Sequence, residues 1–460
     1  MKLTIFISIS RGSIISNFFH SGIINKILSQ GCKVVILTPN YRDKEFFKGY
    51  EHDNLFLEPL ISPKRYKLER LIKEFLKGSI FNKTVHVRYK YRFSGQQPRK
   101  FLYPLRILFL APLKFLPGFK KFIRWFDFKI NPQIEHDYLF KKYKPNLVFA
   151  TTAHTESDVA VLKSAKRFGI ITVDMPKSWD NLSKILFHQK TDYMIVWSPF
   201  MKKQAVQFQD YKKDEVLVTG IPQFDYYTKK SVLLSRGDFC RKVGLNPNKK
   251  IILYGSTGGN CFHESEYIEL IKKYMDQGKL QSTQVLIRPH LGYIGDVEKF
   301  INLEKYPGFI VDRHSKQSNK FKDHWDASID NLNHLFNSLY HSDLCITIAS
   351  TLTLDAVICN TPVININFDC DENIDPNYST KRLYTTDYIN EVISIGGTWV
   401  SESKDQFLHD LKEILEKNKI KEKQRQKLIS YFCYKKDGCS AQRIADVLVN
   451  LAKKNYDKSK

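Results

Sequence analysis

The sequence lacks the cysteine patterns and the long apolar runs that identify several common classes of protein. Its eight cysteines show no Cys-x-x-Cys spacing, and several stand inside apolar runs, where a thiol behaves as a small hydrophobic side chain. We therefore expect reduced, structural cysteines and a cytoplasmic protein. No run of about 18 uninterrupted apolar residues occurs, and the opening MKLTIFISIS is too short for a signal peptide. The sequence predicts that the chain is not an integral membrane protein.

Two nucleotide-binding signatures are also missing. The chain has neither a Walker-type GKS sequence nor a GxGxxG sequence, which argues against a P-loop nucleotidase and against a dinucleotide-dependent enzyme. Nothing in the sequence requires a divalent ion or an organic cofactor, so we expect neither a metal site nor a cofactor.

Negative charge is scarce relative to positive charge. Lys and Arg number 72 against 48 Asp and Glu, which gives a formal net charge of +24. Such an excess favours anionic partners, which include nucleic acid, phospholipid surfaces and phosphorylated substrates. No nucleic-acid recognition motif accompanies the charge, so we expect a phosphorylated substrate and an anionic membrane surface, and no nucleic acid.

What the sequence does contain is the alternation of an α/β protein. A chain of 460 residues exceeds the roughly 250 to 300 residues of one hydrophobic core, and apolar runs alternate with amphipathic stretches in both halves. Continuous apolar runs separated by helical periodicity are typical of parallel sheets covered on both faces. We predict two doubly wound, Rossmann-like α/β domains that face a cleft, at 1–225 and 248–425. A helix in 426–460 is expected to pack back on the first domain.

A basic aromatic segment interrupts the first domain near 86–135. Between 99 and 130 it interleaves aromatic and aliphatic residues with Lys and Arg and has one acidic residue. This composition suits a pair of interfacial helices pressed onto anionic lipid headgroups. The alternative is a helical insertion whose apolar face belongs to the core and whose charges are solvated. Pro104, Pro112 and Pro117 favour short helices over one long helix.

Polar and small residues follow the strands predicted in the second domain. Because open α/β sheets bind ligands beyond the carboxyl ends of their strands, these positions are candidates for a nucleotide diphosphate site. Small residues let backbone amides approach a phosphate closely. Arginine and histidine side chains bind the phosphate oxygens, and the first turn of a helix stabilises the negative charge of the phosphate. Each feature alone has a structural alternative as a turn, a helix cap or an ion pair. The candidate donor-binding residues are Gly255, Ser256, Thr257, Arg288, His290, Ser350, Thr351, Thr353 and Asp355.

The strand ends of the first domain carry the candidates for acceptor chemistry. Arg11 follows the first predicted strand, His154 follows a later one, and the sequence SWDN brings Trp179, Asp180 and Asn181 to a third. A base that activates an acceptor hydroxyl must face the donor across the cleft, which makes Asp180 and His154 the candidate catalytic residues. The alternative for Trp179 is core packing with a satisfied indole N–H. For Asp180 and Asn181 the alternative is a helix N-cap pair.

Five segments give the chain a resemblance to a known family. They are SWDNLSK, VTGIPQFDYY, LIRPH, SDLCITIASTLTLDA and KKDGCSAQRIADVL, and the resemblance spans 148–448. The chain resembles the CDP-glycerol glycerophosphotransferases that build teichoic acids, and related bacterial surface-polysaccharide transferases of the two-domain GT-B fold. The resemblance implies a nucleotide donor on the second domain and an acceptor on the first. It adds Asp225 to Arg11, Trp179 and Asn181 as a candidate acceptor-binding residue.

Departures from the family pattern bear on the expected reaction. Asp180 stands where that family has a histidine thought to act as the base, and His290 is followed by Leu291 rather than by proline. A carboxylate base is the usual arrangement in inverting glycosyl transfer, so this exchange favours a sugar donor over a polyol-phosphate donor.

The sequence therefore predicts an inverting, metal-independent glycosyltransferase. It would move a sugar from a nucleotide-sugar donor to a glycan or lipid-linked glycan acceptor of a surface polysaccharide such as capsule or O-antigen. The expected location is the cytoplasmic side of the cell membrane, with the protein bound peripherally. The alternatives are a CDP-glycerol or CDP-ribitol type polyol-phosphate transferase and a non-catalytic GT-B-like partner protein.

Overall fold

The computed structural model describes most of the chain. It covers residues 2–43, 47, 49–63, 68–93, 96–98, 101–116, 118–152, 154–314, 321, 324, 326, 328–417 and 420–458. Within the insertion expected at 86–135, positions 94, 95, 99, 100 and 117 lie outside the described residues, and the last of these is Pro117.

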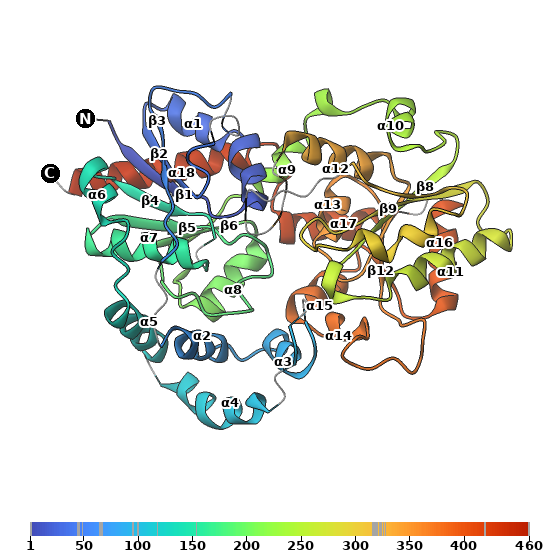
Figure 1. Ribbon diagram of the computed structural model, residues 1–460, viewed down its shortest axis with the longest axis horizontal. Coiled ribbons are helices and arrows are strands. Elements are labelled where there is room, and N and C mark those ends of the chain that lie inside the picture. The colour runs from blue at the N-terminus through green and yellow to red at the C-terminus, as the bar shows by residue number, and fades with distance from the viewer. Residues whose placement is uncertain are drawn as a thin grey trace.

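The first half of the chain forms a seven-stranded parallel sheet, seen on the left of Figure 1. Its strands are β1 (Thr4–Ser8), β2 (Lys33–Thr38), β3 (Leu55–Pro59), β4 (Leu147–Ala150), β5 (Ile171–Asp174), β6 (Tyr193–Val196) and β7 (Val216–Val218). The order across the sheet is β3-β2-β1-β4-β5-β6-β7, so the direction of winding reverses between β1 and β4. Every residue of β1 and β4 is buried, because helices cover both faces of the sheet.

The second half repeats this arrangement in a six-stranded parallel sheet. Its strands are β8 (Lys250–Gly255), β9 (Thr283–Arg288), β10 (Phe309–Val311), β11 (Leu344–Thr347), β12 (Val363–Ile366) and β13 (Trp399–Ser401). The order is β10-β9-β8-β11-β12-β13, and the winding reverses between β8 and β11. The prediction of two doubly wound α/β sheets is confirmed.

Helices connect the strands and cover the sheets on both faces (Figure 1). Those of the first half are α1 (Ile23–Ser29), α6 (Asp137–Tyr143), α7 (Glu156–Arg167), α8 (Pro199–Gln209) and α9 (Pro222–Tyr226). Those of the second half are α10 (Arg236–Val243), α11 (Glu264–Asp276), α12 (Ile329–His341), α13 (Leu352–Ile358), α14 (Lys381–Tyr384), α15 (Asp387–Ser394), α16 (Lys404–Leu415) and α17 (Glu422–Leu428).

A group of short helices lies between β3 and β4 and hangs below the first sheet in Figure 1. They are α2 (Glu69–Gly78), α3 (Lys83–Lys90), α4 (Leu102–Leu110), the 3-10 helix η3 (Pro112–Phe115) and α5 (Phe119–Ile130). Pro104 stands in the first turn of α4 and Pro112 opens η3, where the missing amide hydrogen costs no helical hydrogen bond. Within the described part of the chain, no helix combines the length and the apolar character needed to cross a membrane.

The last helix, α18 (Ser440–Lys458), returns to the first sheet. Its residues Ile444, Leu448 and Val449 are fully buried in the same core as Ile5 and Ile36. The chain thus crosses between the two sheets twice, once after α9 and once before α18.

Candidate active-site cleft

A cavity of about 690 Å³ lies between the two halves of the chain. One wall follows the carboxyl ends of β1, β4, β5 and β6, and the other follows those of β9 and β11. Open α/β sheets bind ligands at this edge, near the point where the strand order reverses. Eight of the residues expected from the sequence line the cavity, which we call the cleft: Arg11, His154, Trp179, Asp180, Asn181, His290, Thr351 and Asp355.

The SWDN segment forms a turn rather than the start of a helix. It follows β5, and the Ser178 amide donates to Asn181 Oδ1 at 2.9 Å while the Asn181 amide donates to the Ser178 carbonyl at 3.2 Å. An asparagine side chain that accepts from the backbone in this way closes a tight turn. The helix N-cap alternative for Asp180 and Asn181 is therefore wrong, and the turn holds the Asp180 side chain on the cleft wall.

Asp180 is an ionised carboxylate with a counterion of its own. Its Oδ2 forms an ion pair with Lys184, one helical turn's length further along the chain, and its Oδ1 accepts from Asn181 Nδ2 at 3.2 Å. Burial alone would raise the pKa of Asp180, but the Lys184 ammonium and a hydrogen bond from Ser178 outweigh burial and hold that pKa below its usual range. The Lys184 ammonium also lies 5.1 Å from the ring centre of Tyr388, which belongs to α15 in the second half of the chain.

His154 contributes a neutral imidazole. It follows β4 and stacks on Phe187, with 5.9 Å between the ring centres. Burial, helped by the charge of Arg11, lowers the pKa of His154 to about 4, so the ring is uncharged at neutral pH. An uncharged imidazole beside the Asp180 carboxylate can accept one proton and donate another.

Four residues of the cleft have a buried polar atom that lacks a hydrogen-bond partner among the described residues. These atoms are Arg11 Nε, His154 Nδ1, Trp179 Nε1 and Trp197 Nε1. Buried polar atoms without a partner are rare in folded proteins and cost free energy. Their convergence on one cavity indicates that a polar ligand completes them.

Trp179 is buried in the core and also lines the cleft. Its ring is 1% exposed and packs edge-on against Tyr388 at 5.3 Å and against Phe432 at 5.5 Å, which makes it part of the core. Its indole N–H is nevertheless one of the unpaired donors at the cleft. The ring is therefore structural, and the N–H is available to a ligand.

The loop after β8 directs its polar groups away from the cleft. Ser256 Oγ donates to Glu264 Oε2 at 2.6 Å, and the Thr257 amide donates to Glu264 Oε1 at 2.8 Å. Glu264 is completely buried and pairs with Lys299 at 2.7 Å. Gly255 lies so close to Leu352 that a side chain at position 255 would collide with it. Ser256 and Thr257 do not line the cavity, and their role as donor-binding residues stays a prediction.

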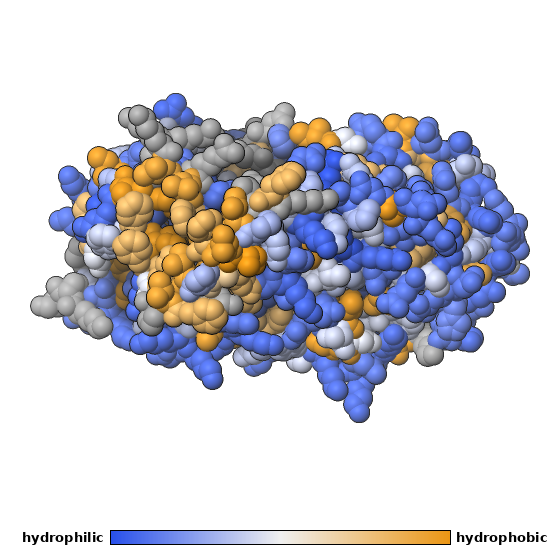
Figure 2. Space-filling view, turned by 90° about the horizontal axis from the view of Figure 1, so that it is seen from below, coloured by the Kyte–Doolittle hydropathy of each residue, from blue (hydrophilic) through white to orange (hydrophobic). Residues whose placement is uncertain are grey.

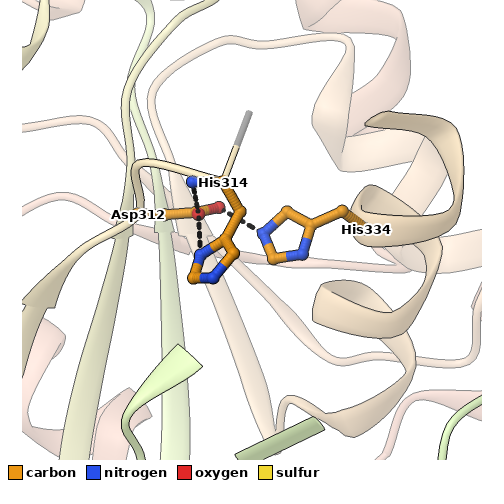
Figure 3. Close-up of side chains that lie close together, drawn as sticks. All are labelled: Asp312, His314 and His334. Carbon is orange, nitrogen blue, oxygen red and sulfur yellow. Dashed lines mark hydrogen bonds and ion pairs between the residues drawn. The ribbon is translucent and has the colours of Figure 1, made fainter. Parts of the chain in front are cut away.

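Arg288 is held by a network of charges at the end of β9, in which Asp312 and His334 are buried and His314 is exposed. Figure 3 shows Asp312 between His314 and His334, with both imidazoles turned toward its carboxylate. The His334 Nε2 to Asp312 Oδ2 distance is 2.7 Å, and Arg288 Nη1 lies 3.4 Å from the same oxygen. The three side chains stand close enough to hold a metal ion, with ligand atoms within 4.8 Å of one another. The Arg288 guanidinium already supplies the positive charge there, so we interpret the cluster as an ion-pair network that fixes Arg288.

His290 and Thr351 line the cleft, whereas the nearby candidates Arg288, Ser350 and Thr353 do not. His290 Nδ1 accepts from the Gly292 amide at 3.1 Å, and burial lowers the pKa of His290, so it is a neutral ring with its proton on Nε2. Ser350 Oγ accepts from the Leu352 amide at 3.2 Å, and Thr353 Oγ1 donates into the core to Asn365. The turn between β11 and α13 also contains a non-glycine residue at φ 44°, Ala349, whose amide donates to Tyr384 Oη. Strained backbone of this kind is often found at binding sites.

Asp355 is the second carboxyl group of the cleft wall. Its Oδ1 accepts from Tyr227 Oη at 2.8 Å and from Gln223 Nε2 at 3.2 Å. Burial raises the pKa of Asp355 to about 7, against the hydrogen bond from Tyr227 and the charge of Arg288. Asp355 therefore changes its charge near neutral pH.

Asp225 lies outside the cleft and caps a helix. Its two carboxylate oxygens accept from the amides of Ser440 at 3.0 Å and Ala441 at 2.7 Å, in the first turn of α18. Gly220, at φ 94°, packs so tightly here that an added Cβ would stand 2.5 Å from Ser440 Oγ. Two of the five family-like segments, GIPQFD and DGCSAQR, are thus in contact with each other at the crossing between the halves.

The sequence-based search missed several residues of the cleft. Lys177 and Lys184 flank SWDN and add two positive charges, and Trp197 follows β6 at the strand-end position used to find the others. Gln223 and Phe224 come from the crossing segment. The strand-end rule was sufficient to find Trp197, but no local pattern marks Gln223 and Phe224, because the fold of the whole chain brings them there.

Comparison with known proteins adds a family and a fold. The family model described as CDP-Glycerol:Poly(glycerophosphate) glycerophosphotransferase matches residues 163–450. None of the curated proteins matches the chain significantly. The UDP-GlcNAc 2-epimerase of Methanocaldococcus jannaschii has 13% sequence identity and a TM-score of 0.56, over 98% of this chain and 100% of that chain. A glycosyltransferase from Rickettsia africae ESF-5 has 12% identity and a TM-score of 0.54, over 98% of this chain and 99% of that chain. At these identities the solved structures establish the fold alone, which is GT-B-like, as predicted.

Proposed function

Since the chain belongs to the CDP-glycerol:poly(glycerophosphate) glycerophosphotransferase family and is therefore a transferase, we propose that the group it transfers is a sugar. The donor is a nucleotide-sugar, and the acceptor is a hydroxyl of a growing cell-surface polysaccharide, such as a capsule or O-antigen glycan or its lipid-linked precursor. The single observation that carries this proposal is the ionised Asp180 carboxylate on the cleft wall, at the position where the resembling family has histidine.

The charge of Asp180 suits attack at carbon better than attack at phosphorus. In glycosyl transfer the anomeric carbon gains positive charge as the bond to the leaving group lengthens, and a nearby carboxylate stabilises that charge. In polyol-phosphate transfer the attacked phosphoryl group is itself anionic, so an ionised carboxylate beside it is repulsive. A neutral histidine lacks this repulsion.

The proposed step uses residues of both walls. The acceptor hydroxyl loses its proton to Asp180 while its oxygen bonds to the anomeric carbon of the donor. The bond between that carbon and the diphosphate oxygen breaks, and the electron pair leaves with the nucleoside diphosphate, which inverts the anomeric centre. Lys177 and Arg11 supply positive charge, and the N–H groups of His290 and Trp179 supply hydrogen bonds. The step needs no metal ion or cofactor.

Lys184 limits the strength of Asp180 as a base. Its ion pair with Asp180 keeps the carboxylate ionised but also weakens its affinity for a proton. We propose that substrate binding draws the Lys184 ammonium toward the diphosphate, which releases the carboxylate at the moment when it must accept a proton. The rings of Tyr388 and Phe93, 5.1 and 5.7 Å from the ammonium, provide an alternative partner for it.

The proposed place of action is the cytoplasmic side of the cell membrane. All eight cysteines are free thiols, which supports a reducing compartment. Nucleotide-sugars are made in the same compartment as their nucleotides, so a donor site on this side is consistent with the proposed chemistry.

Asp180→Asn tests the proposal. The variant keeps the shape of the side chain but cannot accept the proton, so we expect kcat to fall by about 10²- to 10⁴-fold while the affinity for the donor nucleotide changes less than about threefold. The matched control is Asp214→Asn, a substitution at an exposed position. If polysaccharide output in cells carrying Asp180→Asn equals that of the unmodified protein, the chain is a non-catalytic partner and the proposal is wrong.

Polyol-phosphate transfer is the second candidate, and the family match favours it. It uses the same fold and the same cleft, with CDP-glycerol or CDP-ribitol as the donor. Release of CMP from CDP-glycerol distinguishes it from sugar transfer, which releases a nucleoside diphosphate.

A further inference from the structure

A second cavity, of about 620 Å³, lies where α3 of the first half meets α14, α15 and the loop before α14 in the second half. This volume is within the range of about 300–1,000 Å³ that is common for ligand sites. No Asp or Glu is found among the described residues that line the cavity. We call it the groove, and its lining includes Lys83, His86, Tyr91, Lys381, Arg382 and Tyr384.

Reciprocal hydrogen bonds fix the two walls of the groove to each other. The amide and the hydroxyl of Thr84, in the first turn of α3, donate to Asp387 Oδ2 at 2.8 and 2.9 Å. The amide of Asp387, the first residue of α15, donates back to Thr84 Oγ1 at 3.0 Å. Thr84 is fully buried, so water does not compete for these bonds. The two halves of the chain therefore build the groove together and hold its shape.

Arg382 is a buried cation of the groove wall that lacks a carboxylate partner. Its side chain is 5% exposed, and its Nε and Nη2 donate to the carbonyls of Arg92 and Asn260 at 2.9 and 2.6 Å. Within the part of the chain that the structure describes, Arg382 forms no ion pair. Burial lowers the pKa of Arg382, and the charge of Arg92 acts in the same direction, yet an arginine stays charged at neutral pH. A buried charge without a counterion is costly, so an anion in the groove is stabilised.

Two exposed lysines add to the positive charge, one on each wall. Lys83 belongs to α3 and Lys381 to α14, and neither ammonium has an ion-pair partner among the described residues. The carboxylate of Asp369, in the loop before α14, accepts from the Ser379 hydroxyl at 2.6 Å and does not line the groove. The first carboxylate of α15 is held by the reciprocal bonds to α3. The positive charge of the groove is therefore not neutralised by these acidic side chains.

The uncharged lining of the groove indicates the class of anion that fits. The rings of Tyr91 and Tyr384 lie beside the polar side chains of Ser379, Thr385 and Asn390. Hydroxyl and amide groups form hydrogen bonds with sugar hydroxyls, and a tyrosine offers an apolar ring face together with a hydroxyl. Figure 2 views the molecule from the side on which α3 and α14 lie in Figure 1, and its surface over the second half is mostly hydrophilic. This lining suits a saccharide that carries negative charge.

The groove and the cleft lie on either side of a shared wall. Tyr384 lines the groove, and its Oη accepts at 3.1 Å from the Ala349 amide, in the turn that brings Thr351 to the cleft. On the other wall, Arg88 Nη1 of α3 donates at 3.3 Å to the carbonyl of Lys184, which lines the cleft. A saccharide chain held in the groove thus lies next to the cleft.

We propose that the groove binds an anionic saccharide, with phosphate or carboxylate groups that contact Lys83, Lys381 and Arg382, and that this saccharide is part of the acceptor glycan. The identification of the ligand as acceptor rests on the proposed function. The binding of an anionic saccharide needs no donor and is measured by itself.

Isothermal titration calorimetry of the full chain tests the proposal. Hexagalacturonate and a phosphorylated maltohexaose carry the two kinds of charge, and unmodified maltohexaose is the neutral reference. We expect the charged probes to bind at least ~tenfold more tightly than the neutral one, and salt to weaken their binding. The double variant Lys83→Gln, Lys381→Gln should lower the affinity for the charged probes by about fivefold or more, because two charge contacts are lost. Saturation with UDP or CDP should not displace either charged probe, because the nucleotides bind in the cleft.

A matched control separates the groove from the overall charge of +24. The variant Lys213→Gln, Lys423→Gln removes the same two charges at exposed positions that do not line the groove, and its affinity should stay within ~twofold of the unmodified protein. Circular dichroism checks that both variants fold. Equal losses in the two variants, or no loss in either, overturn the proposal, and so does displacement of the charged probes by UDP or CDP. A failure to use any nucleotide-sugar refutes sugar transfer alone, because these titrations contain no donor.

Discussion

Asp225→Ala is expected to destabilise the protein without altering its chemistry. Asp225 is 7% exposed, and its carboxylate accepts from two amides in the first turn of α18, at 3.0 and 2.7 Å. A hydrogen bond to a charged group contributes about 1.5–3 kcal/mol, and favourable charge at a helix N-terminus adds about 0.3–1 kcal/mol. Removal of the carboxylate leaves two buried amides unpaired, so the expected loss is about 4 kcal/mol.

Differential scanning calorimetry measures this loss. For a domain of 150 to 250 residues, about 4 kcal/mol corresponds to a fall of about 8–16 °C in the midpoint of the transition that unfolds the first domain. The Asp225→Asn variant keeps one accepting oxygen, so its midpoint should fall by about half as much. The midpoint of the exposed control Asp214→Ala should stay within about 1 °C of that of the unmodified protein. The KM for the acceptor, measured well below the midpoint, should not change. An unchanged midpoint together with a raised acceptor KM would show that Asp225 binds the acceptor and that its capping role is unimportant.

Three further substitutions probe the cleft and the crossing between the halves. Asp355→Asn should flatten the pH dependence of the KM for the donor, because the wild-type carboxyl ionises as pH rises through about 7 and then repels the diphosphate. The same pH dependence of KM in the variant and the wild type would contradict this. Lys184→Met should raise the pKa of Asp180 in the substrate-free protein, so the acid limb of the kcat/KM profile should move up by ~1 unit or more, and an unmoved limb removes Asp180 from the role of base. Gly220→Ala should lower the free energy of unfolding by ~2 kcal/mol or more, and with it the thermal midpoint, because of its collision with Ser440 Oγ and its φ of 94°. Gly278→Ala, with φ 69° and no neighbour within 4 Å, should cost less.

The two sheets were predictable because their signals are local. A buried parallel strand appears in the sequence as an apolar run, and the residues directly after it mark the edge at which ligands bind. This rule identified Arg11, His154, Asp180, His290 and Thr351 as candidates. The structure brings all five side chains to one cavity.

Contacts between residues that are distant in the sequence could not be predicted from local patterns. Ser256 and Thr257 follow a strand, but Glu264 and its partner Lys299 take up their hydrogen bonds in a buried pair. Asp225 is tied to a helix that begins 215 residues later. Nothing near these positions in the sequence reveals such contacts.

Helix α5 shows the same limit in a different form. Its composition indicates an amphipathic helix but not which face is inside, and Arg124 and Asp127 are buried only because Asp210 and Lys163 lie opposite them. The inward turn of the charged face depends on tertiary contacts, so only the folded structure reveals which face of α5 is exposed.

The donor preference of the purified protein is the most direct test of sugar transfer. Nucleotide-sugars, CDP-glycerol and CDP-ribitol are offered singly with a surface glycan acceptor, and the released nucleotide is identified. We expect at least one nucleotide-sugar to yield its nucleoside diphosphate and an inverted glycosidic linkage, with the activity lost in Asp180→Asn. Release of CMP from CDP-glycerol or CDP-ribitol, with no turnover of any nucleotide-sugar, would contradict sugar transfer and establish a polyol-phosphate transferase.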